Sequence, residues 1–163
     1  MARAFLFICL FAGVSWAQTD KPSLETFRRE ALTLGAAVDS AVSAAVPGRS
    51  PFQSGAKATY LEGYGALVTI ETALEGPRNP FTSPKTPAEN RAIMTQRLEN
   101  LQKALEKLLQ ERTEKLESLA STDSITLVVY IFNANPGDAP DFPSQLVCTA
   151  KKEDPTHVKV QKF

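Results

Sequence analysis

Ser54 and Lys57 have the spacing of a Ser-x-x-Lys pair, the arrangement in which a lysine deprotonates a nucleophilic serine in penicillin-interacting enzymes. That chemistry needs the two side chains one turn apart on a helix. Gly55 and the strand-like pattern that follows place this pair at a junction between a loop and a strand instead, and no Ser-Asp-Asn or Lys-Thr-Gly motif accompanies it. The pattern favours an ordinary loop, with a small serine hydrolase as the alternative.

Four oxygen-bearing side chains lie close together in the sequence, at Asn133, Asn135, Asp138 and Asp141. Carboxylate and amide oxygens are ligands that Ca²⁺ accepts, although this spacing is not that of a known calcium loop. Asn and Asp beside proline and glycine also form turns through local hydrogen bonds. We therefore interpret the cluster as turn formers and predict no metal or other cofactor.

Three loops rich in proline each hold one phenylalanine: Phe52, Phe81 and Phe142. Aromatic rings on proline-stiffened loops can form a recognition surface, because aromatic side chains carry much of the binding energy at interfaces. The alternative is that each ring packs over the edge of a small core. The sequence leaves both interpretations open.

Cys148 and His157 are the remaining side chains with distinctive chemistry. Cys148 alternates with other small or apolar residues on one side of a predicted strand, so a buried and inert thiol is expected. His157 follows Asp-Pro-Thr in a predicted turn, where a solvated imidazole is expected. One histidine and one such cysteine are too few for a zinc site.

Residues 1–17 show the three-part pattern of a secretory signal, with one basic residue, a short apolar run, and small residues at Ser15 and Ala17. We expect cleavage after Ala17, which leaves a single domain over 18–163. The apolar run is too short for a spanning helix, which needs about 20 residues. Lipid attachment at Cys9 is not expected, because bulky residues precede it.

The charges of the chain balance, with 18 basic and 18 acidic side chains. A protein without net charge has no general electrostatic attraction to nucleic acid or to anionic membranes. After the signal no stretch is long and apolar enough to span a membrane. Cys148 would then be the sole cysteine, so stability must come from the core rather than from an internal disulfide.

Two amphipathic helices are predicted. The first covers 23–45 and ends at Pro47 and Gly48. The second begins at Thr86-Pro87-Ala88-Glu89, a capping sequence, and extends to about 120. Its apolar residues recur at 11-residue steps, which suits a straight helix on a sheet better than a coiled coil. Self-association through part of this helix is the alternative.

A β-hairpin is predicted over 56–74, turning at Gly63 and Gly65, because glycine accepts the positive φ that such turns need. A single long strand with a glycine bulge is the alternative.

Three more strand segments follow the second helix. Residues 124–132 are apolar on both faces, which predicts an interior strand, whereas 145–151 and 157–162 alternate and predict half-exposed strands. Together the segments predict an α+β fold: a mostly antiparallel sheet of four or five strands with both helices packed on one face.

The segment Tyr60-Leu61-Glu62-Gly63-Tyr64-Gly65, followed by Ala-Leu-Val-Thr-Ile-Glu, resembles a segment of uncharacterised exported bacterial proteins. In those proteins a signal and a helix precede the segment, and a charged helix and a hydrophobic strand follow it. The resemblance implies a location in the bacterial envelope and transfers no functional residue.

The leading functional hypothesis is a non-enzymatic exported protein, periplasmic or secreted, that binds another envelope component. Edge strands such as 157–162 and the phenylalanine loops are its candidate surfaces. The alternatives are the serine hydrolase and a carrier of a small ligand, with its site between the long helix and the sheet.

Overall fold

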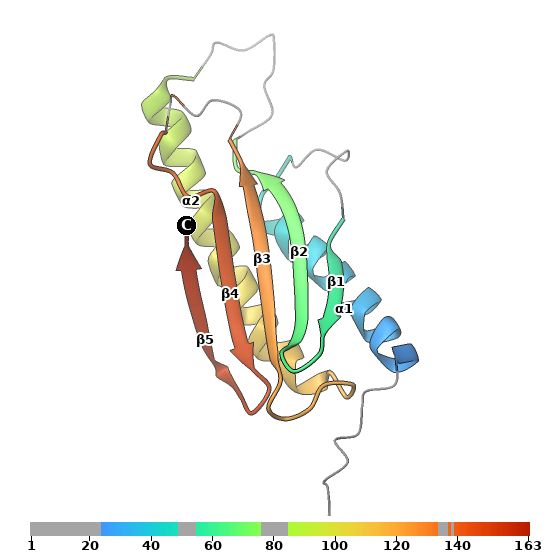
Figure 1. Cartoon of the computed structure of the whole chain (residues 1–163). Helices are drawn as coiled ribbons and strands as arrows, with labels where there is room; N and C mark the ends of the chain where they lie inside the picture. The colour runs from blue at the N-terminus through green and yellow to red at the C-terminus, as the bar shows by residue number, and fades with distance from the viewer. Residues whose placement is uncertain (1–23, 49–54, 76–84, 134–136, 138) are drawn as a thin grey trace, which may run out of the picture.

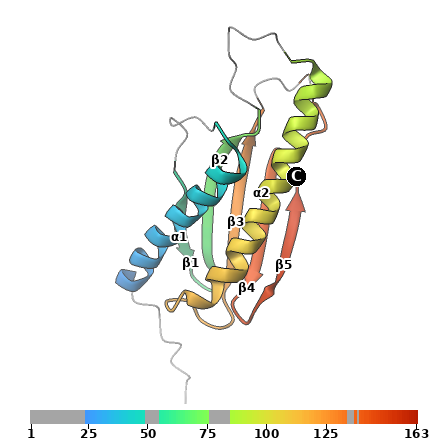
Figure 2. The ribbon, with the colours of Figure 1, turned by 180° about the vertical axis from the view of Figure 1, so that it is seen from behind.

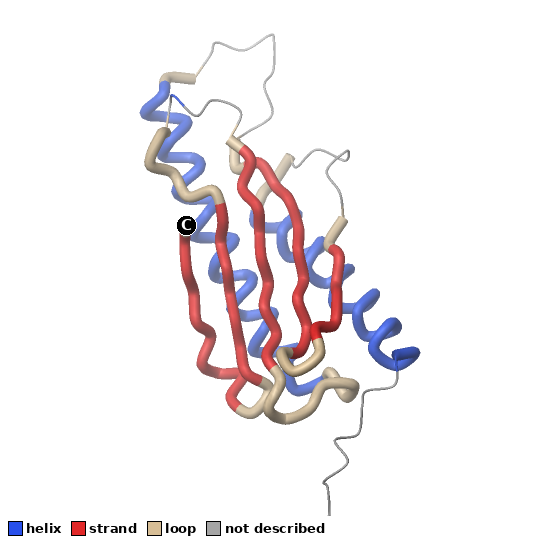
Figure 3. Tube along the Cα trace, viewed as in Figure 1, coloured by secondary structure: helices blue, strands red, loops and turns tan. Residues whose placement is uncertain are grey.

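The computed structural model describes residues 24–48, 55–75, 85–133, 137 and 139–163. The elements follow one another as α1 (Leu24–Ala45), β1 (Lys57–Leu61), β2 (Gly65–Ala73), α2 (Pro87–Arg112), a single 3₁₀ turn (Thr113–Lys115), β3 (Ser124–Phe132), β4 (Gln145–Lys151) and β5 (Asp154–Lys162). Figure 1 shows the five strands side by side, and Figure 3 separates strands from helices by colour.

The described strands form one sheet in the order β1-β2-β3-β4-β5 (Figure 1). Every pair of neighbours is antiparallel except β2 and β3, which run parallel because α2 carries the chain back between them. This arrangement confirms the predicted α+β class, the mostly antiparallel sheet and the two helices.

Both helices pack on the same face of the sheet, as the views from the two sides show (Figures 1 and 2). α2 lies over the strands towards β5, and α1 lies towards β1, where Phe27 meets Tyr60 edge to face with ring centroids 5.5 Å apart. The side chains of β3 that face the helices are Ile125, Leu127, Val129 and Ile131, and none is more than 6% exposed. The core therefore occupies the space between the helices and one face of the sheet.

The turn between β1 and β2 explains why glycines occur where they do. Gly63 has a φ of 76° and Gly65 a φ of 121°, both in the region that favours glycine. A Cβ on Gly65 would lie 2.1 Å from the carbonyl oxygen of Ser124 at the start of β3. The predicted hairpin is confirmed, and the alternative of one long bulged strand is wrong.

The start of α2 is the one predicted from the sequence. The Thr86 hydroxyl accepts a hydrogen bond from the Glu89 amide, and the Glu89 carboxylate accepts one from the Thr86 amide at 2.8 Å. The Thr86 amide and the Thr86 hydroxyl both donate to the Glu89 carboxylate, and these two hydrogen bonds lower the pKa of Glu89 because they stabilise its charged form.

The end of α2 differs from the prediction, because the α-helix stops at Arg112 rather than near 120. The Thr113 hydroxyl donates to the Leu109 carbonyl at 2.6 Å, and the chain then turns. Leu116 and Leu119 are buried in this turn, where their carbonyl oxygens accept hydrogen bonds from the Lys152 ammonium group. Apolar spacing extended the predicted helix too far, since buried leucines satisfy the same pattern in a packed turn.

Candidate functional site

The face of the sheet opposite the helices is the candidate site, and we call it the open sheet face. No helix or strand among the described residues covers it (Figures 1 and 2). The register places these side chains on it: Lys57, Thr59 and Leu61 from β1; Leu67, Thr69 and Glu71 from β2; Thr126, Val128, Tyr130 and Phe132 from β3; Val147, Thr149 and Lys151 from β4; Lys159 and Gln161 from β5.

The centre of the open sheet face is apolar. Val128 on β3 lies beside Val147 on β4, and both are half-buried by their neighbours alone. Further along β3, Tyr130 is 43% exposed and Phe132 is 65% exposed. The prediction of an interior strand is therefore correct for the central position of β3, but among the described residues only one of its two apolar faces is covered.

Hydroxyl groups order the other end of this face. The Tyr64 hydroxyl and the Thr126 hydroxyl share a hydrogen bond, and Thr126 shares a second with Thr149, with 2.8 Å between the two threonine oxygens. Thr126 is only 5% exposed, because Tyr64 reaches it from the hairpin turn. The tyrosine of the Gly-Tyr-Gly segment thus has a structural part in shaping the face.

The charged side chains of the open sheet face lie around the apolar centre and are mostly basic. Lys57 and Lys159 stand on the two edge strands, Lys151 stands at the end of β4, and Glu71 supplies one acidic group. Lysines on edge strands oppose the addition of another strand, because pairing would bury their charge. The sheet edges are therefore poorer docking sites than the face between them.

The Ser-x-x-Lys pair cannot be assembled from the described residues, since Ser54 lies outside them. Lys57 is the first residue of β1, and its side chain is exposed on the open sheet face. Phe52 and Phe81 also lie outside the described residues. Phe142 is described and packs against the hydrophobic core, as expected of a ring that covers the edge of a core.

Two residues of the oxygen cluster, Asn135 and Asp138, lie outside the described residues. Of the other two, Asp141 is exposed and Asn133 is half-buried. Within the described ranges no three histidine, cysteine or acidic side chains lie close enough to hold a metal ion.

Cys148 is fully buried on the covered face of the sheet, as its alternation in the sequence predicts. Burial raises the pKa of its thiol to about 12, because the thiolate would lose its hydration there. His157 is exposed, as expected, with its Nδ1 3.3 Å from the Asp154 carboxylate. A hydrogen bond from the Thr156 hydroxyl is the main reason why the pKa of Asp154 is lowered.

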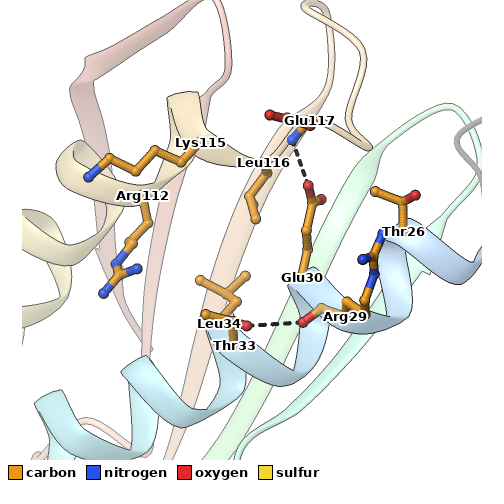
Figure 4. Close-up of a pocket in the computed structure, with 9 residues that line it drawn as sticks. All are labelled: Thr26, Arg29, Glu30, Thr33, Leu34, Arg112, Lys115, Leu116 and Glu117. Atoms are coloured by element: carbon orange, nitrogen blue, oxygen red, sulfur yellow. Dashed lines mark hydrogen bonds between the residues drawn. The ribbon is translucent and has the colours of Figure 1, made fainter.

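A pocket of about 260 Å³ lies between α1 and the turn that follows α2. Its lining residues are Thr26, Arg29, Glu30, Thr33, Leu34, Arg112, Lys115, Leu116 and Glu117 (Figure 4). The Glu30 carboxylate holds the pocket together, because it accepts hydrogen bonds from the amides of Glu117 and Ser118, at 2.8 and 3.2 Å, and from the Ser118 hydroxyl. The predicted carrier site, between the long helix and the sheet, is instead filled by core side chains.

The sequence does not predict this pocket, because the mixed charges of a long amphipathic helix are typical of a surface that faces solvent. One signal was available: a heptad continued from Leu98 and Leu101 places Arg112 and Lys115 where apolar residues are expected. Basic side chains on the otherwise apolar side of a helix indicate that the buried surface ends there or that it contacts a charged group.

The chain matches no known family, and no curated protein or solved structure is significantly similar to it. Within the described residues, no helix combines the length and the apolarity that a membrane crossing requires.

Proposed function

We propose that this chain is an exported, non-enzymatic binding protein that docks a partner protein of the envelope on its open sheet face. The observation that supports the proposal most directly is the contrast along β3. Ile125, Leu127 and Val129 are buried by the helices, yet Tyr130 and Phe132 on the opposite side remain 43% and 65% exposed. Exposed contiguous apolar surface is typical of interaction sites.

The open sheet face is large enough for a specific complex. Strands of nine residues rise about 3.3 Å per residue, and five strands about 4.8 Å apart span roughly 20 Å, which gives a flat area of roughly 600 Å². A standard interface buries about 800 Å² on each partner. Side chains that project from the strands add area to this flat estimate, so the face can supply most of an interface of that size.

The composition of the face defines the partner's chemistry. Aromatic rings are enriched at the centres of interfaces, where water is excluded, and charged groups are found at the rim. Here the rings of Tyr130 and Phe132 lie at the end of β3, while Lys57, Lys159 and Lys151 stand beside Val128, Thr126 and Ser124, further back along the face. We therefore infer a partner protein whose surface has an apolar area that meets the rings and acidic side chains to one side of it.

Site-specific photocrosslinking in the intact host tests the proposal. A benzophenone amino acid replaces Tyr130 in one variant and Leu32 in the control. Leu32 is a suitable control because it is 77% exposed on α1. We expect a single adduct with another protein from position 130 and none from position 32. Equal adducts at both positions, or none at 130, would contradict the docking face, and an adduct of the chain with itself would identify a homodimer instead.

A surface variant adds a test of specificity. Phe132→Ser removes an exposed ring, so the free energy of unfolding should change by less than about 0.5 kcal/mol. The adduct from position 130 should nevertheless fall at least about tenfold, because a few aromatic residues contribute most of the binding energy of an interface. An unchanged yield from a normally folded variant would place the partner elsewhere.

The exported location has its own test, which does not depend on the partner. The N-terminal pattern Ser15-Trp16-Ala17 supports cleavage after Ala17. Mass spectrometry of protein from the envelope fraction should find Gln18 as the first residue. Intact protein confined to the cytoplasm would contradict this part of the proposal while leaving the docking face to be judged by crosslinking.

A further inference from the structure

The pocket between α1 and the turn after α2 collects basic side chains from two separate elements. Arg29 comes from α1, and Arg112 and Lys115 come from the end of α2 and the 3₁₀ turn. Figure 4 shows Arg112 and Lys115 on one side and Arg29 on the other, with Leu34 and Leu116 between them. The pocket belongs to the helical layer and not to the open sheet face.

Within the described ranges, the basic groups of the pocket form no ion pair with a neighbouring side chain. None of the ion pairs among the described residues involves Arg29, Arg112 or Lys115. The pocket contains two carboxylates, and the one on Glu30 is occupied by hydrogen bonds from the chain around Ser118. Those hydrogen bonds leave the charge of Glu30 in place, so three basic and two acidic side chains give the lining one net positive charge.

The helix dipole accounts for only part of this arrangement. Basic residues near a helix C-terminus are stabilised by the partial negative charge there, which suits Arg112 and Lys115. These two residues are nevertheless three apart on one helical surface, where like charges repel. Arg29 stands near the opposite end of its own helix, where the dipole gives no such support. A bound anion would relieve the repulsion between all three.

The pocket also has an apolar floor. Leu34 is 4% exposed and Leu116 is 8% exposed, so their side chains present an apolar surface beneath the charges. The volume of about 260 Å³ is close to the lower end of the roughly 300–1,000 Å³ that ligand pockets have. A fitting ligand is therefore small, with an anionic group at one end and a short apolar part at the other.

We propose that this pocket binds a small organic anion. Its carboxylate or phosphate group is held by Arg112 and Lys115, its short apolar part lies against Leu34 and Leu116, and Arg29 adds positive charge on the other side of the pocket. Guanidinium groups suit both kinds of anion because their N–H donors match two oxygens at once. This pocket is separate from the open sheet face, so the protein would bind a small anion in addition to its partner protein.

Nuclear magnetic resonance titration of the purified protein tests this site with four probes: hexyl phosphate, hexanoate, inorganic phosphate and uncharged hexanol. We expect saturable shifts of the Leu34 and Leu116 amides with hexyl phosphate, hexanoate or both. Hexanol and inorganic phosphate should bind at least about tenfold more weakly, because each lacks one of the two kinds of contact. No saturable shift with either amphiphilic anion, or equal binding of hexanol, would overturn the proposal.

Charge-reversal variants give the matched control. Arg112→Glu should weaken binding of the better anion by at least about tenfold, whereas Arg91→Glu, an equal change of charge near the other end of α2, should leave it within about twofold. Arg29→Ala provides a second test of the site that keeps α2 unchanged. Equal losses in both charge-reversal variants would show a general charge effect and overturn the assigned site. Photocrosslinking from position 130 remains the separate test of the docking face.

Discussion

The two faces of the sheet belong to the same five strands but have different surroundings. On β3 the residues that face the helices, from Ile125 to Ile131, are at most 6% exposed. The alternate residues of the same strand range from Thr126, which is buried, to Phe132, which is 65% exposed. A strand that is apolar on both sides normally has both sides covered. Packing against the helices therefore explains half of the β3 sequence, and the proposed docking of a partner would explain the other half.

The largest expected effect compares neighbouring residues on the two faces. Leu127→Ala should lower the free energy of unfolding by about 2–5 kcal/mol, because it leaves a cavity in the core. Val128→Ala, one residue further on, should lower the free energy of unfolding by less than about half as much, because Val128 is only half-buried and its removal leaves no closed cavity. Urea denaturation measures both. Equal losses would mean that the open sheet face is covered after all in the isolated protein.

The burial of Cys148 on the covered face should make the free energy of unfolding depend on pH. The pKa of Cys148 in the folded protein is about 12, above the 9.0 of an unburied thiol, so its contribution to stability is fully present below about pH 9 and is lost as the pH rises towards 12. At about pH 10.5 the unfolded thiol is mostly ionised, and about 2 kcal/mol should be lost relative to pH 8. Urea midpoints at the two pH values measure this change.

Cys148→Ala is the control, because lysines and tyrosines titrate in both proteins and only the wild type has the thiol. The pH-dependent loss should be smaller in the variant by that amount. The same loss in both proteins would show that the thiol is not shielded by the fold.

The smallest expected effect comes from a buried hydroxyl group on the covered face. Thr72 on β2 is fully buried, and among the described residues its hydroxyl is the one buried side-chain group without a hydrogen-bond partner. Thr72→Val keeps the shape and removes the unpaired hydroxyl, so it should raise the free energy of unfolding by about 1 kcal/mol. Thr69→Val on the open sheet face, where the hydroxyl can reach water, should change it by less than about 0.5 kcal/mol. Thermal melts compare the two, and destabilisation by Thr72→Val would indicate a hidden partner for the hydroxyl.

The elements that the sequence predicted correctly are those fixed by local rules. The start of α2 depends on Thr86 and Glu89, three residues apart, and the hairpin depends on Gly63 and Gly65. The alternation around Cys148 likewise showed which of its sides is buried. In each case the deciding contacts lie within a few residues, so periodicity and capping chemistry suffice.

The features that the sequence did not predict depend on residues far apart in the chain. α2 ends where it does partly because Lys152, in the turn between β4 and β5, binds the carbonyls of Leu116 and Leu119. The pocket exists because Glu30 from α1 holds the amide of Ser118. Half-exposed strands are expected at 145–151 and 157–162, but the sequence pattern of β3 predicts two covered faces, and its exposed Tyr130 and Phe132 are evident only from the packing of the helices. Sequence patterns over a few residues carry no information about such long-range contacts.

The parallel pairing of β2 with β3 has a consequence for how the chain folds. Gly65 pairs with Ser124, about 60 residues further along, whereas the other neighbouring strands are joined by much shorter connections. Closing a loop of that length costs roughly 3–4 kcal/mol of chain entropy, and long-range pairings of this kind slow folding. The part before α2 and the part from α2 onwards are therefore two blocks of local structure that meet where β2 pairs with β3 and where α1 packs beside α2. Separately expressed fragments cut between β2 and α2 should reassociate through these contacts, which makes this connection the place to divide the protein into a two-fragment reporter.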